Sequence, residues 1–433
     1  MTSIKYSITI LIIINLCNLF CHNIFLPFNS KSQQIKSHEI TSEQEPSLIT
    51  NIIINNSSDK YKIVHLHEGT YFIDKQISIN NNITIVGVPE KTIIRPTKNF
   101  EGENIFLFNN SQFIDNISFK NIFFNGIDAP NINAIKIVGN HNITSNISIQ
   151  QCKFENLNIG IQASNIKMII SNNNFTNVKH GLLILNCLNC KIYNNTCDHS
   201  INCFTFNDTN GAASENVKIY NNYIYKITNY PIHFADVSTI FHNNIYIYKN
   251  RIIGDTSTYS TSFTGGSADM VSVYGGDRVK IKNNKISGGG DMGITIQRSQ
   301  NVKITHNNID HNAKSGIVIS SLGSPNKIYD GIFINKNTIM YNGQYPLGGN
   351  PASLTGIYLE DNNESGVSII LGDNKIINNQ NLPNNRIYQI SARVGNKSSI
   401  IYKGNKQMQN NEVLLKNTKI SIKRKPKNIL QWD

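Results

Sequence analysis

The sequence predicts an all-β protein, a single-stranded right-handed parallel β-helix (solenoid) in which short strands wind into a stack of rungs. A repeated apolar frame that ends in Asn-x-apolar predicts the rungs, because its shortest intervals are about 22 or 23 residues, a typical solenoid repeat. The Ile-x-Ile alternation within the frame predicts strands whose every second side chain points inward. The prevalence of Ile, Val and Phe also favours strands over helices.

One Asn occupies the same place in each repeat, two residues before an apolar residue. Its eight copies are Asn173, Asn195, Asn222, Asn250, Asn284, Asn307, Asn337 and Asn374. Rungs of parallel strands lie about 4.8 Å apart, so equivalent side chains stack directly on one another. An inward-facing Asn at a sharp turn can then hydrogen-bond the backbone and the Asn above and below it. We therefore expect a structural ladder of asparagines with no catalytic role.

Residues 1–25 have the features of a signal peptide or an anchor. Lys5 supplies a modest positive charge, and the apolar stretch at residues 8–20 is short for a membrane span. No clear cleavage site follows, so we expect a membrane partner only if this segment stays uncleaved. The protein is expected to be secreted, periplasmic or on the cell surface.

The remaining chain divides into a cap, a body and a tail. Residues 26–59 would form a linker and a short amphipathic N-terminal helix, starting near Pro46, that caps the open end of the solenoid. The parallel β-helix is expected over residues 60–405. Residues 406–433 would add a C-terminal strand and a basic tail.

The first expected rungs carry a recognisable pattern. It consists of a Gly-Thr-Tyr turn at residues 69–71, an Ile-Ser-Ile strand at 77–79 and the sequence Ile-Thr-Ile-Val-Gly at 83–87. This pattern resembles the first rungs of the pectate-lyase-like β-helix superfamily. Together with the asparagines, the resemblance covers roughly residues 60–405 and is specific for the fold. It implies a carbohydrate-active enzyme or a non-catalytic relative, since the superfamily contains both.

The chain carries a formal net charge of +12 and has a pI near 9.2. A basic surface attracts anionic partners. We expect an acidic polysaccharide or another glycan and no nucleic acid, because the chain has no recognised nucleic-acid motif and carries features of export. The alternative explanation for many of the lysines is codon bias, because the chain is rich in Ile, Asn and Lys together, as is typical of an AT-rich genome.

Five cysteines lie outside the N-terminal segment: Cys152, Cys187, Cys190, Cys197 and Cys203. An odd number leaves at least one thiol unpaired within the chain. The Cys187-x-x-Cys190 spacing is that of half a zinc site, but no second pair completes it. Buried cysteines of the rungs or one local disulfide explain the pattern more simply.

Charged residues gather in the middle of the chain, at the turn before one strand of each rung. Asp269 and Asp291 are 22 residues apart, about one rung, so we expect their carboxylates to be neighbours. Lys314 takes the matching place on the next rung, and Arg298 lies across the strand from Asp291. These four are the predicted catalytic residues. The alternative is that each Asp forms a turn and each cation is a solvated surface charge.

Outward-facing residues of the same strands should form two stacks along a cleft. One stack contains His233 and Tyr358, and the other contains Tyr274, Gln297 and Glu360. Polar and aromatic side chains in these places would bind a sugar chain, with the tyrosines stacking on its rings. These five residues are the predicted substrate-binding set.

Three functions are compatible with this arrangement. The first is β-elimination on a uronate polysaccharide, in which Asp269 and Asp291 would hold Ca²⁺ while Arg298 or Lys314 serves as the base. We expect this reaction, and return of the proton to the opposite face would instead give epimerisation. The second is glycoside hydrolysis by the two carboxylates. The third is a non-catalytic surface β-helix that binds glycans or serves as a structural element.

The hydrolase alternative rests on a second resemblance. The order Ser-Ala-Asp269, Gly-Gly-Asp291 and Lys314-Ser-Gly has a rung spacing similar to the Asn-Thr-Asp, Gly-Asp-Asp and Gly-His-Gly series of the polygalacturonase family. Gly290 stands where that family has an Asp, and Ser315 stands where it has a His. The motif is therefore degenerate, and the family's full catalytic set is not implied.

Overall fold

The computed structural model describes a large part of the chain. The described residues are 36–40, 62–79, 82–109, 116–139, 146–207, 213–235, 241–255, 269–321, 328–343, 355–360, 366–377, 379, 388–393, 399–402, 407–408, 412–416, 419–422 and 428–432. The chain divides into two compact units, residues 1–36 and 37–433. The predicted signal segment 1–25 and the predicted capping helix near Pro46 lie outside the described residues.

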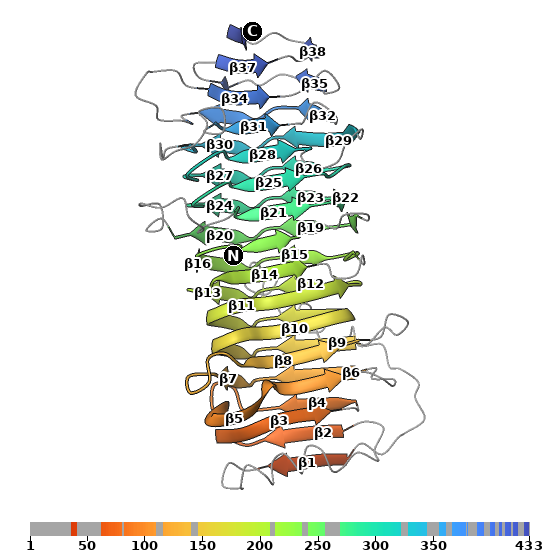
Figure 1. Cartoon of the computed structure of the whole chain (residues 1–433), viewed down its shortest axis with the longest axis vertical. Coiled ribbons are helices and arrows are strands. Elements are labelled where there is room, and N and C mark those ends of the chain that lie inside the picture. Colours follow the sequence, from red (N-terminus) through yellow and green to blue (C-terminus); the bar gives the residue numbers. More distant parts are fainter. Residues whose placement is uncertain are drawn as a thin grey trace, which may run out of the picture. The chain divides into compact units, whose positions relative to one another are not determined.

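The second unit is a parallel β-helix, in which the chain passes through three columns of strands, A, B and C, on each rung (Figure 1). Column A consists of β2 (Lys62–Leu66), β4 (Ile83–Val86), β6 (Asn116–Lys120), β9 (Asn146–Gln150), β12 (Lys191–Tyr193), β15 (Lys218–Tyr220), β19 (Tyr246–Tyr248), β23 (Lys280–Lys282), β26 (Lys303–Thr305), β29 (Ile328–Asn335), β32 (Gly366–Leu371), β35 (Ser399–Tyr402) and β38 (Lys419–Ile422). Column B consists of β7 (Phe123–Asn125), β13 (Thr196–Asp198), β16 (Tyr223–Ile227), β20 (Arg251–Gly254), β24 (Lys285–Ser287), β27 (Asn308–Asp310), β30 (Thr338–Met340), β33 (Lys375–Ile377) and β36 (Gln407–Met408).

Column C completes each rung. It consists of β8 (Asn133–Val138), β14 (Asn202–Asn207), β17 (Ile232–Phe234), β21 (Val271–Tyr274), β25 (Ile294–Gln297), β28 (Ile317–Ser320), β31 (Ile357–Glu360), β34 (Tyr388–Arg393), β37 (Glu412–Lys416) and β39 (Asn428–Trp432). Four longer strands run through more than one column: β3 (Gly69–Ile79), β5 (Thr92–Asn109), β10 (Lys153–Ser171) and β11 (Asn174–Cys187). The remaining strands are β1 (Lys36–Ile40), β18 (His242–Asn243) and β22 (Gly276–Asp277).

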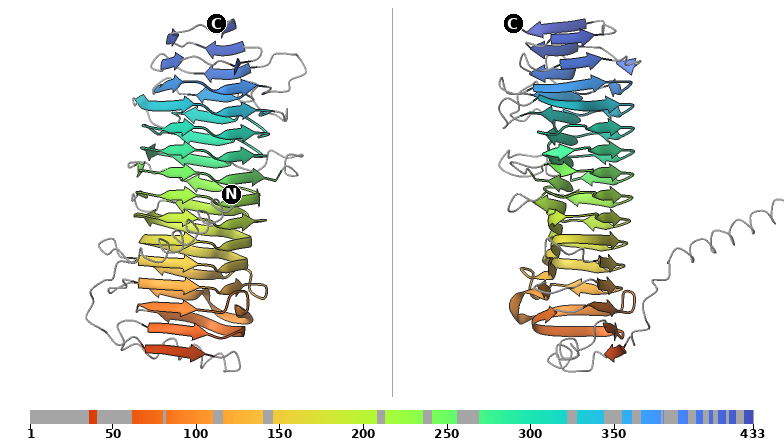
Figure 2. Two further views of the ribbon diagram at one scale, coloured as in Figure 1. Left: turned by 180° about the vertical axis from the view of Figure 1, so that it is seen from behind. Right: turned by 90° about the vertical axis from the view of Figure 1, so that its right-hand side faces the viewer.

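The strands of successive rungs stack side by side (Figure 2), and equivalent residues lie directly opposite one another, as the repeat predicted. In column A, for example, Ile192 pairs with Ile219, and Ile219 pairs in turn with Ile247. The pairing is parallel from β2 to β39, and the predicted right-handed parallel β-helix is confirmed. Parallel pairing also continues beyond residue 405, because β39 pairs with β37 up to Trp432.

The eight predicted asparagines form one continuous hydrogen-bonded ladder in the turn between columns A and B. From Asn173 to Asn337, each donates from its side-chain Nδ2 to the Oδ1 of the next ladder asparagine over 2.9–3.0 Å. All eight are at most 2% exposed. The residue before each of the first seven has a left-handed φ of 54–57°, which makes the turn sharp: Asn172, Asn194, Asn221, Lys249, Asn283, His306 and Lys336.

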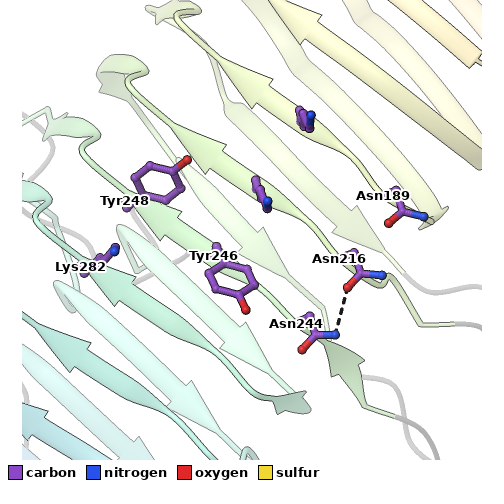
Figure 3. A pocket seen from close by; sticks show the side chains of 8 residues that line it. Asn189, Asn216, Asn244, Tyr246, Tyr248 and Lys282 are labelled. Carbon is purple, nitrogen blue, oxygen red and sulfur yellow. Dashed lines mark hydrogen bonds between the residues drawn. The ribbon is translucent and has the colours of Figure 1, made fainter.

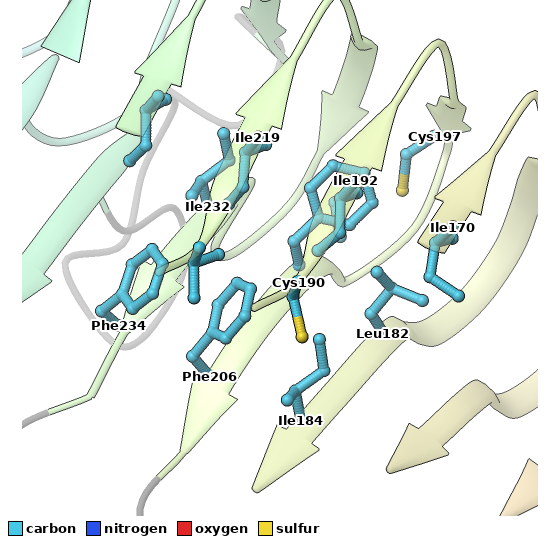
Figure 4. Close-up of a cluster of buried hydrophobic side chains, with 14 of the residues drawn as sticks. Ile170, Leu182, Ile184, Cys190, Ile192, Cys197, Phe206, Ile219, Ile232 and Phe234 are labelled. Carbon is cyan, nitrogen blue, oxygen red and sulfur yellow. The ribbon is translucent and has the colours of Figure 1, made fainter. Parts of the chain in front are cut away.

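Apolar side chains from all three columns fill the interior (Figure 4). The rings of Phe206 and Phe234 stack at 4.2 Å between centroids, one rung apart. Each such buried side chain stabilises the fold by about 1.5–3 kcal/mol relative to exposure. Cys187 and Cys190 form a disulfide, while Cys152, Cys197 and Cys203 are buried thiols. A local disulfide and buried rung cysteines are thus both present.

A second, shorter ladder stabilises the turn between columns B and C, and the sequence repeat did not predict it. Asn312 donates to Asn342 over 2.8 Å, and Asn342 donates to Asn379 over 2.9 Å, in each case from Nδ2 to Oδ1. Gly289 continues it by donating its backbone N–H to Asn312 Oδ1 over 2.9 Å. This ladder holds the turns that carry Asp291 and Lys314. No helix in the described part of the chain is long and apolar enough to cross a membrane.

Candidate functional site

Three of the predicted catalytic residues lie on successive turns between columns B and C. Asp269 precedes β21, Asp291 precedes β25, and Lys314 precedes β28. Backbone hydrogen bonds join these turns, since Met270 N donates to Met292 O over 3.0 Å and Lys314 N donates to Asp291 O over 3.0 Å. The structure therefore brings Asp269, Asp291 and Lys314 onto neighbouring rungs.

Asp291 and Lys314 form an ion pair with 2.9 Å between Oδ1 and Nζ. Both side chains are accessible in part, with 30% of Asp291 and 17% of Lys314 exposed. Burial raises the pKa of the Asp291 carboxyl, and the Lys314 ammonium opposes that rise. An ammonium group in this place can also receive a carboxylate from a bound ligand.

Asp269 is more deeply buried, at 6% exposure. Burial, and then the neighbouring Asp291 carboxylate, raise the pKa of Asp269 to about 7. The Tyr274 hydroxyl donates to Asp269 Oδ2 over 3.1 Å. Burial and the Asp269 charge raise the pKa of Tyr274, so its hydroxyl stays protonated. A carboxyl with a pKa near neutrality suits proton transfer at neutral pH.

Aromatic side chains lie beside this carboxyl. The His233 ring stacks on Tyr230 at 4.2 Å between centroids and meets the edge of Tyr274 at 5.3 Å. Its Nδ1 lies 2.7 Å from the Ser272 hydroxyl. Burial, with a smaller effect of His242, lowers the pKa of His233 to about 4, so the ring is neutral at neutral pH. Tyr230 was not predicted, because it lies outside the repeated frame.

Both predicted outward stacks exist in the stated register. His233, Ser272, Thr295, Val318 and Tyr358 pair in sequence along column C, as do Tyr274, Gln297, Ser320 and Glu360. Every member of the first stack is at most 9% exposed, whereas Tyr274, Gln297 and Glu360 are partly exposed. Of the five predicted substrate-binding residues, His233 and Tyr358 are therefore buried, and Tyr274, Gln297 and Glu360 have side-chain surface that a ligand can reach.

Arg298 lies at the other end of β25 from Asp291. At about 3.3 Å per residue, that strand alone spans roughly 13 Å, so the two side chains start from opposite sides of column C. The Arg298 backbone has a left-handed φ of 46° and donates its N–H to Ser320 O over 2.9 Å. The geometry thus places Arg298 at the far border of the site rather than beside Lys314.

The donor set does not by itself suit calcium. Ca²⁺ takes about six to eight oxygen ligands. Asp269 accepts a hydrogen bond from Tyr274, and Asp291 already pairs with an ammonium group, which repels a cation. In the described residues, no group of three or more His, Cys, Asp and Glu side chains is arranged to hold a metal ion. The Ca²⁺ requirement stays a prediction, and no step below is routed through a metal.

Comparisons with known proteins agree with this architecture. A family model described as a right handed beta helix region matches residues 214–350 and, in a second alignment, 250–413. A model described as rhamnogalacturonase A/epimerase, pectate lyase-like, matches residues 40–136. The chain is a right-handed parallel β-helix protein. No curated protein matches its sequence.

Solved structures share this β-helix fold at low sequence identity. The catalytic unit of the thermostable GH87 α-1,3-glucanase of Streptomyces thermodiastaticus strain HF3-3 has a TM-score of 0.58 and 11% identity, over 87% of this chain and 69% of that one. A point mutant of the periplasmic alginate epimerase AlgG has a TM-score of 0.53 and 13% identity, over 89% of this chain and 83% of that one. At such identities the similarity concerns the fold.

The β-helix protein also has an open groove of about 690 Å³ on the outer side of column A (Figure 3). It is lined by Asn189, Lys191, Asn216, Lys218, Asn244, Tyr246, Tyr248 and Lys282. The groove was not predicted, although its signal is visible in the Lys-Ile-Tyr repeats at 191–193 and 218–220. In each repeat the Ile points inward and defines the rung. The Lys before it points outward and lines the groove, and the Tyr after it points outward and adjoins the groove.

Proposed function

We propose that this β-helix protein is a carbohydrate-active enzyme that cleaves an acidic polysaccharide by β-elimination at Asp269, Asp291 and Lys314. One observation carries the proposal. A buried carboxyl with a pKa of about 7 lies on the rung next to a partly exposed carboxylate–ammonium pair. Such a combination supplies a proton acceptor active near neutrality and a cation for the substrate's own carboxylate.

The elimination uses Lys314, Asp269 and Tyr274 directly, and Asp291 holds the Lys314 ammonium in place until the substrate binds. The Lys314 ammonium binds the uronate carboxylate and so acidifies the adjacent C–H. Ionised Asp269 removes that proton, the C–C double bond forms, and the bond to the leaving glycosidic oxygen breaks. The Tyr274 hydroxyl protonates the leaving oxygen and then recovers a proton from Asp269 along their hydrogen bond. The protons balance, and the site returns to its starting state.

Three observations support a glycan substrate. Two proteins of the same fold are named as enzymes of polysaccharides, a glucanase and an alginate epimerase. The net charge of +12 favours an acidic polymer over a neutral one. The partly exposed Tyr274 and Gln297 lie on adjacent rungs of column C, and the partly exposed Glu360 lies two rungs beyond Gln297 in the same register, as contacts to a sugar chain along the helix axis would. Export, predicted from residues 1–25, would bring the protein to such polymers.

Glycoside hydrolysis is the second candidate, because the two carboxyls have different environments. Asp269 has the raised pKa of a general acid, and Asp291 is paired with Lys314. In a hydrolase, Asp269 would protonate the leaving oxygen and Asp291 would activate water. Lys314 argues against this assignment, because an ammonium group paired with Asp291 weakens it as a base.

Product analysis separates these reactions. Purified protein is incubated with polygalacturonate, alginate and a neutral glucan, with added Ca²⁺ and with chelator. β-Elimination gives an unsaturated product that absorbs in the ultraviolet together with new reducing ends, whereas hydrolysis gives reducing ends alone. If the protein binds a polymer but forms no product from any of them, the proposal of an enzyme would be wrong, and a glycan-binding β-helix would take its place. Loss of activity on addition of chelator, and its return with added Ca²⁺, would confirm the predicted Ca²⁺ requirement.

A further inference from the structure

A stack of tyrosines runs along the outer side of column A. Tyr193, Tyr220 and Tyr248 lie on successive rungs, with centroids 4.9 Å apart and ring planes within 7° of parallel. Lys282 continues the stack, with its Nζ 5.7 Å from the centre of the Tyr248 ring. The ring faces are therefore turned toward one another along the helix axis, and the ring edges and hydroxyls are turned toward solvent.

A second row, mostly of lysines, runs beside this stack. Lys191, Lys218, Tyr246 and Lys280 follow one another in register on β12, β15, β19 and β23. Lys280 Nζ lies 4.9 Å from the centre of the Tyr246 ring. Within the described residues, no carboxylate forms an ion pair with these lysines or with Lys282. Their positive charge is thus available to a ligand.

Asparagine amides form the border of the groove (Figure 3). Asn189, Asn216 and Asn244 occupy equivalent turns, each with a left-handed φ between 55° and 61°. Asn244 Nδ2 donates to Asn216 Oδ1 over 2.9 Å. Across the groove, the first three rungs therefore present an amide, then an ammonium or a phenol of the second row, and then a tyrosine of the stack. The fourth rung presents Arg278, Lys280 and Lys282 in the same order.

We propose that this groove binds an acidic polysaccharide lying along the helix axis, on strands other than those that carry Asp269 and Asp291. The repeat of the groove is the rung spacing, and an extended pyranose polymer repeats at a comparable length. A carboxylate on each sugar can then pair with successive lysines while ring hydroxyls bond the amides and phenols. The groove adds a polymer-binding surface to the protein and does not depend on cleavage at the other site.

The same geometry disfavours a single-stranded nucleic acid. Such ligands gain much of their affinity by stacking bases on exposed aromatic faces. Here the faces of Tyr220 lie against Tyr193 and Tyr248, and Lys282 covers the next face. A groove that offers ring edges, hydroxyls and ammonium groups suits carboxylates and sugar hydroxyls better.

Binding of the full chain to fluorescently labelled polygalacturonate tests the proposal. The triple variant Lys191→Gln, Lys218→Gln, Lys282→Gln removes three groove charges. The triple variant Lys179→Gln, Lys285→Gln, Lys375→Gln removes three exposed lysines from other positions and serves as the matched control. We expect the dissociation constant to rise about tenfold or more in the groove variant and less than about twofold in the control.

Two further arms make the result specific. Tyr248→Phe, which keeps the ring stack and removes one hydroxyl from the groove, should weaken binding by about two- to fivefold. A thymidine oligonucleotide should bind more weakly than polygalacturonate at equal ionic strength. Equal losses in both lysine variants, no loss in either, or tighter binding of the oligonucleotide would overturn the proposal. Failure of the cleavage assay would leave this binding result unaffected, so the two proposals are tested separately.

Discussion

Asp291 and Lys314 occupy equivalent places on successive rungs, and their side chains form an ion pair of 2.9 Å. Both belong to the turn between columns B and C, where the short ladder from Asn312 holds the backbone. Because one rung separates them, residues 23 positions apart in the sequence lie side by side and form an ion pair. In the proposed elimination, this pair opens to admit the carboxylate of the substrate.

Removing the ammonium group should impair the site without disturbing the fold. Lys314→Met keeps most of the side-chain length and removes the charge. We expect kcat/KM for a uronate polymer to fall at least about a hundredfold, because the substrate carboxylate loses its partner. The pKa of Asp291 should rise further, since Lys314 now lowers it. Both are measurable, by initial rates and by a carboxyl titration followed by NMR.

The control for that variant is Lys153→Met, which removes an ammonium group paired with Glu155 on an early rung. It should leave the rate within about twofold of the wild type, as expected for a surface ion pair. Equal rates for Lys314→Met and Lys153→Met would remove Lys314 from the mechanism.

The buried carboxyl of Asp269 should make stability depend on pH. Its pKa is about 7 in the folded chain against a usual value of 3.8, so the folded state holds the proton more tightly. The resulting stability is complete below about pH 4 and is lost as the pH rises to about 7. Asp269→Asn lacks this dependence. The free energy of unfolding of the variant relative to the wild type should therefore increase over that range, by up to about 4 kcal/mol.

Urea unfolding at several pH values measures this difference. The Asp128→Asn variant is the control, because Arg95 lowers the pKa of Asp128 and the dependence has the opposite sign. A constant difference between Asp269→Asn and the wild type from pH 4 to pH 8 would mean that Asp269 is ionised at a normal pKa.

His242 should make the protein less stable at acidic pH, which is the opposite of the pH dependence expected from Asp269. Its Nδ1 accepts a hydrogen bond from Ser214 N over 3.1 Å, and its Nε2–H donates to Ala235 O over 2.7 Å. Burial lowers the pKa of this ring to about 4, so only the neutral form is accommodated. Stability is therefore complete above about pH 6.5 and is lost as the pH falls toward 4, by up to about 3 kcal/mol. In His242→Gln this acid-induced loss should shrink, whereas the exposed His311→Gln should retain it.

The asparagine ladder should be costly to interrupt. Asn250 donates to Ile219 O and to Asn284 Oδ1, and it accepts from the backbone N–H of Asn222. Asn250→Ala leaves these buried groups without partners, which should cost about 3 kcal/mol or more in the free energy of unfolding. Asn174→Ala, at a half-exposed strand position, should cost less than about 1 kcal/mol. Equal and small losses in both variants would show that the ladder is dispensable.

Much of the fold could be predicted from the sequence because its signal is repeated. The Asn of each A–B turn and the Ile beside it recur often enough to fix the rung, the register and even the two outward stacks through His233 and Tyr274. The neighbourhood of Asp269, Asp291 and Lys314 followed from the same spacing. Single positions without a repeat, such as Tyr230, carried no such signal.

Burial of the first outward stack could not be read from spacing. A residue such as Tyr358 points away from the core in the repeat, yet it is only 4% exposed. Its exposure depends on what packs over column C, and the repeat does not encode that. The place of Arg298, by contrast, followed from the sequence, because the strand β25 separates it from the turn of Asp291.

The most direct test of the central claim is the rate of ultraviolet-absorbing product formation from a uronate polymer, compared between the wild type and Asp269→Asn. The proposal predicts that the wild-type rate rises with pH through about 7, as Asp269 becomes ionised, and that Asp269→Asn loses at least about a hundredfold while Asp128→Asn does not. An Asp269→Asn variant that forms the unsaturated product at the wild-type rate would contradict the account.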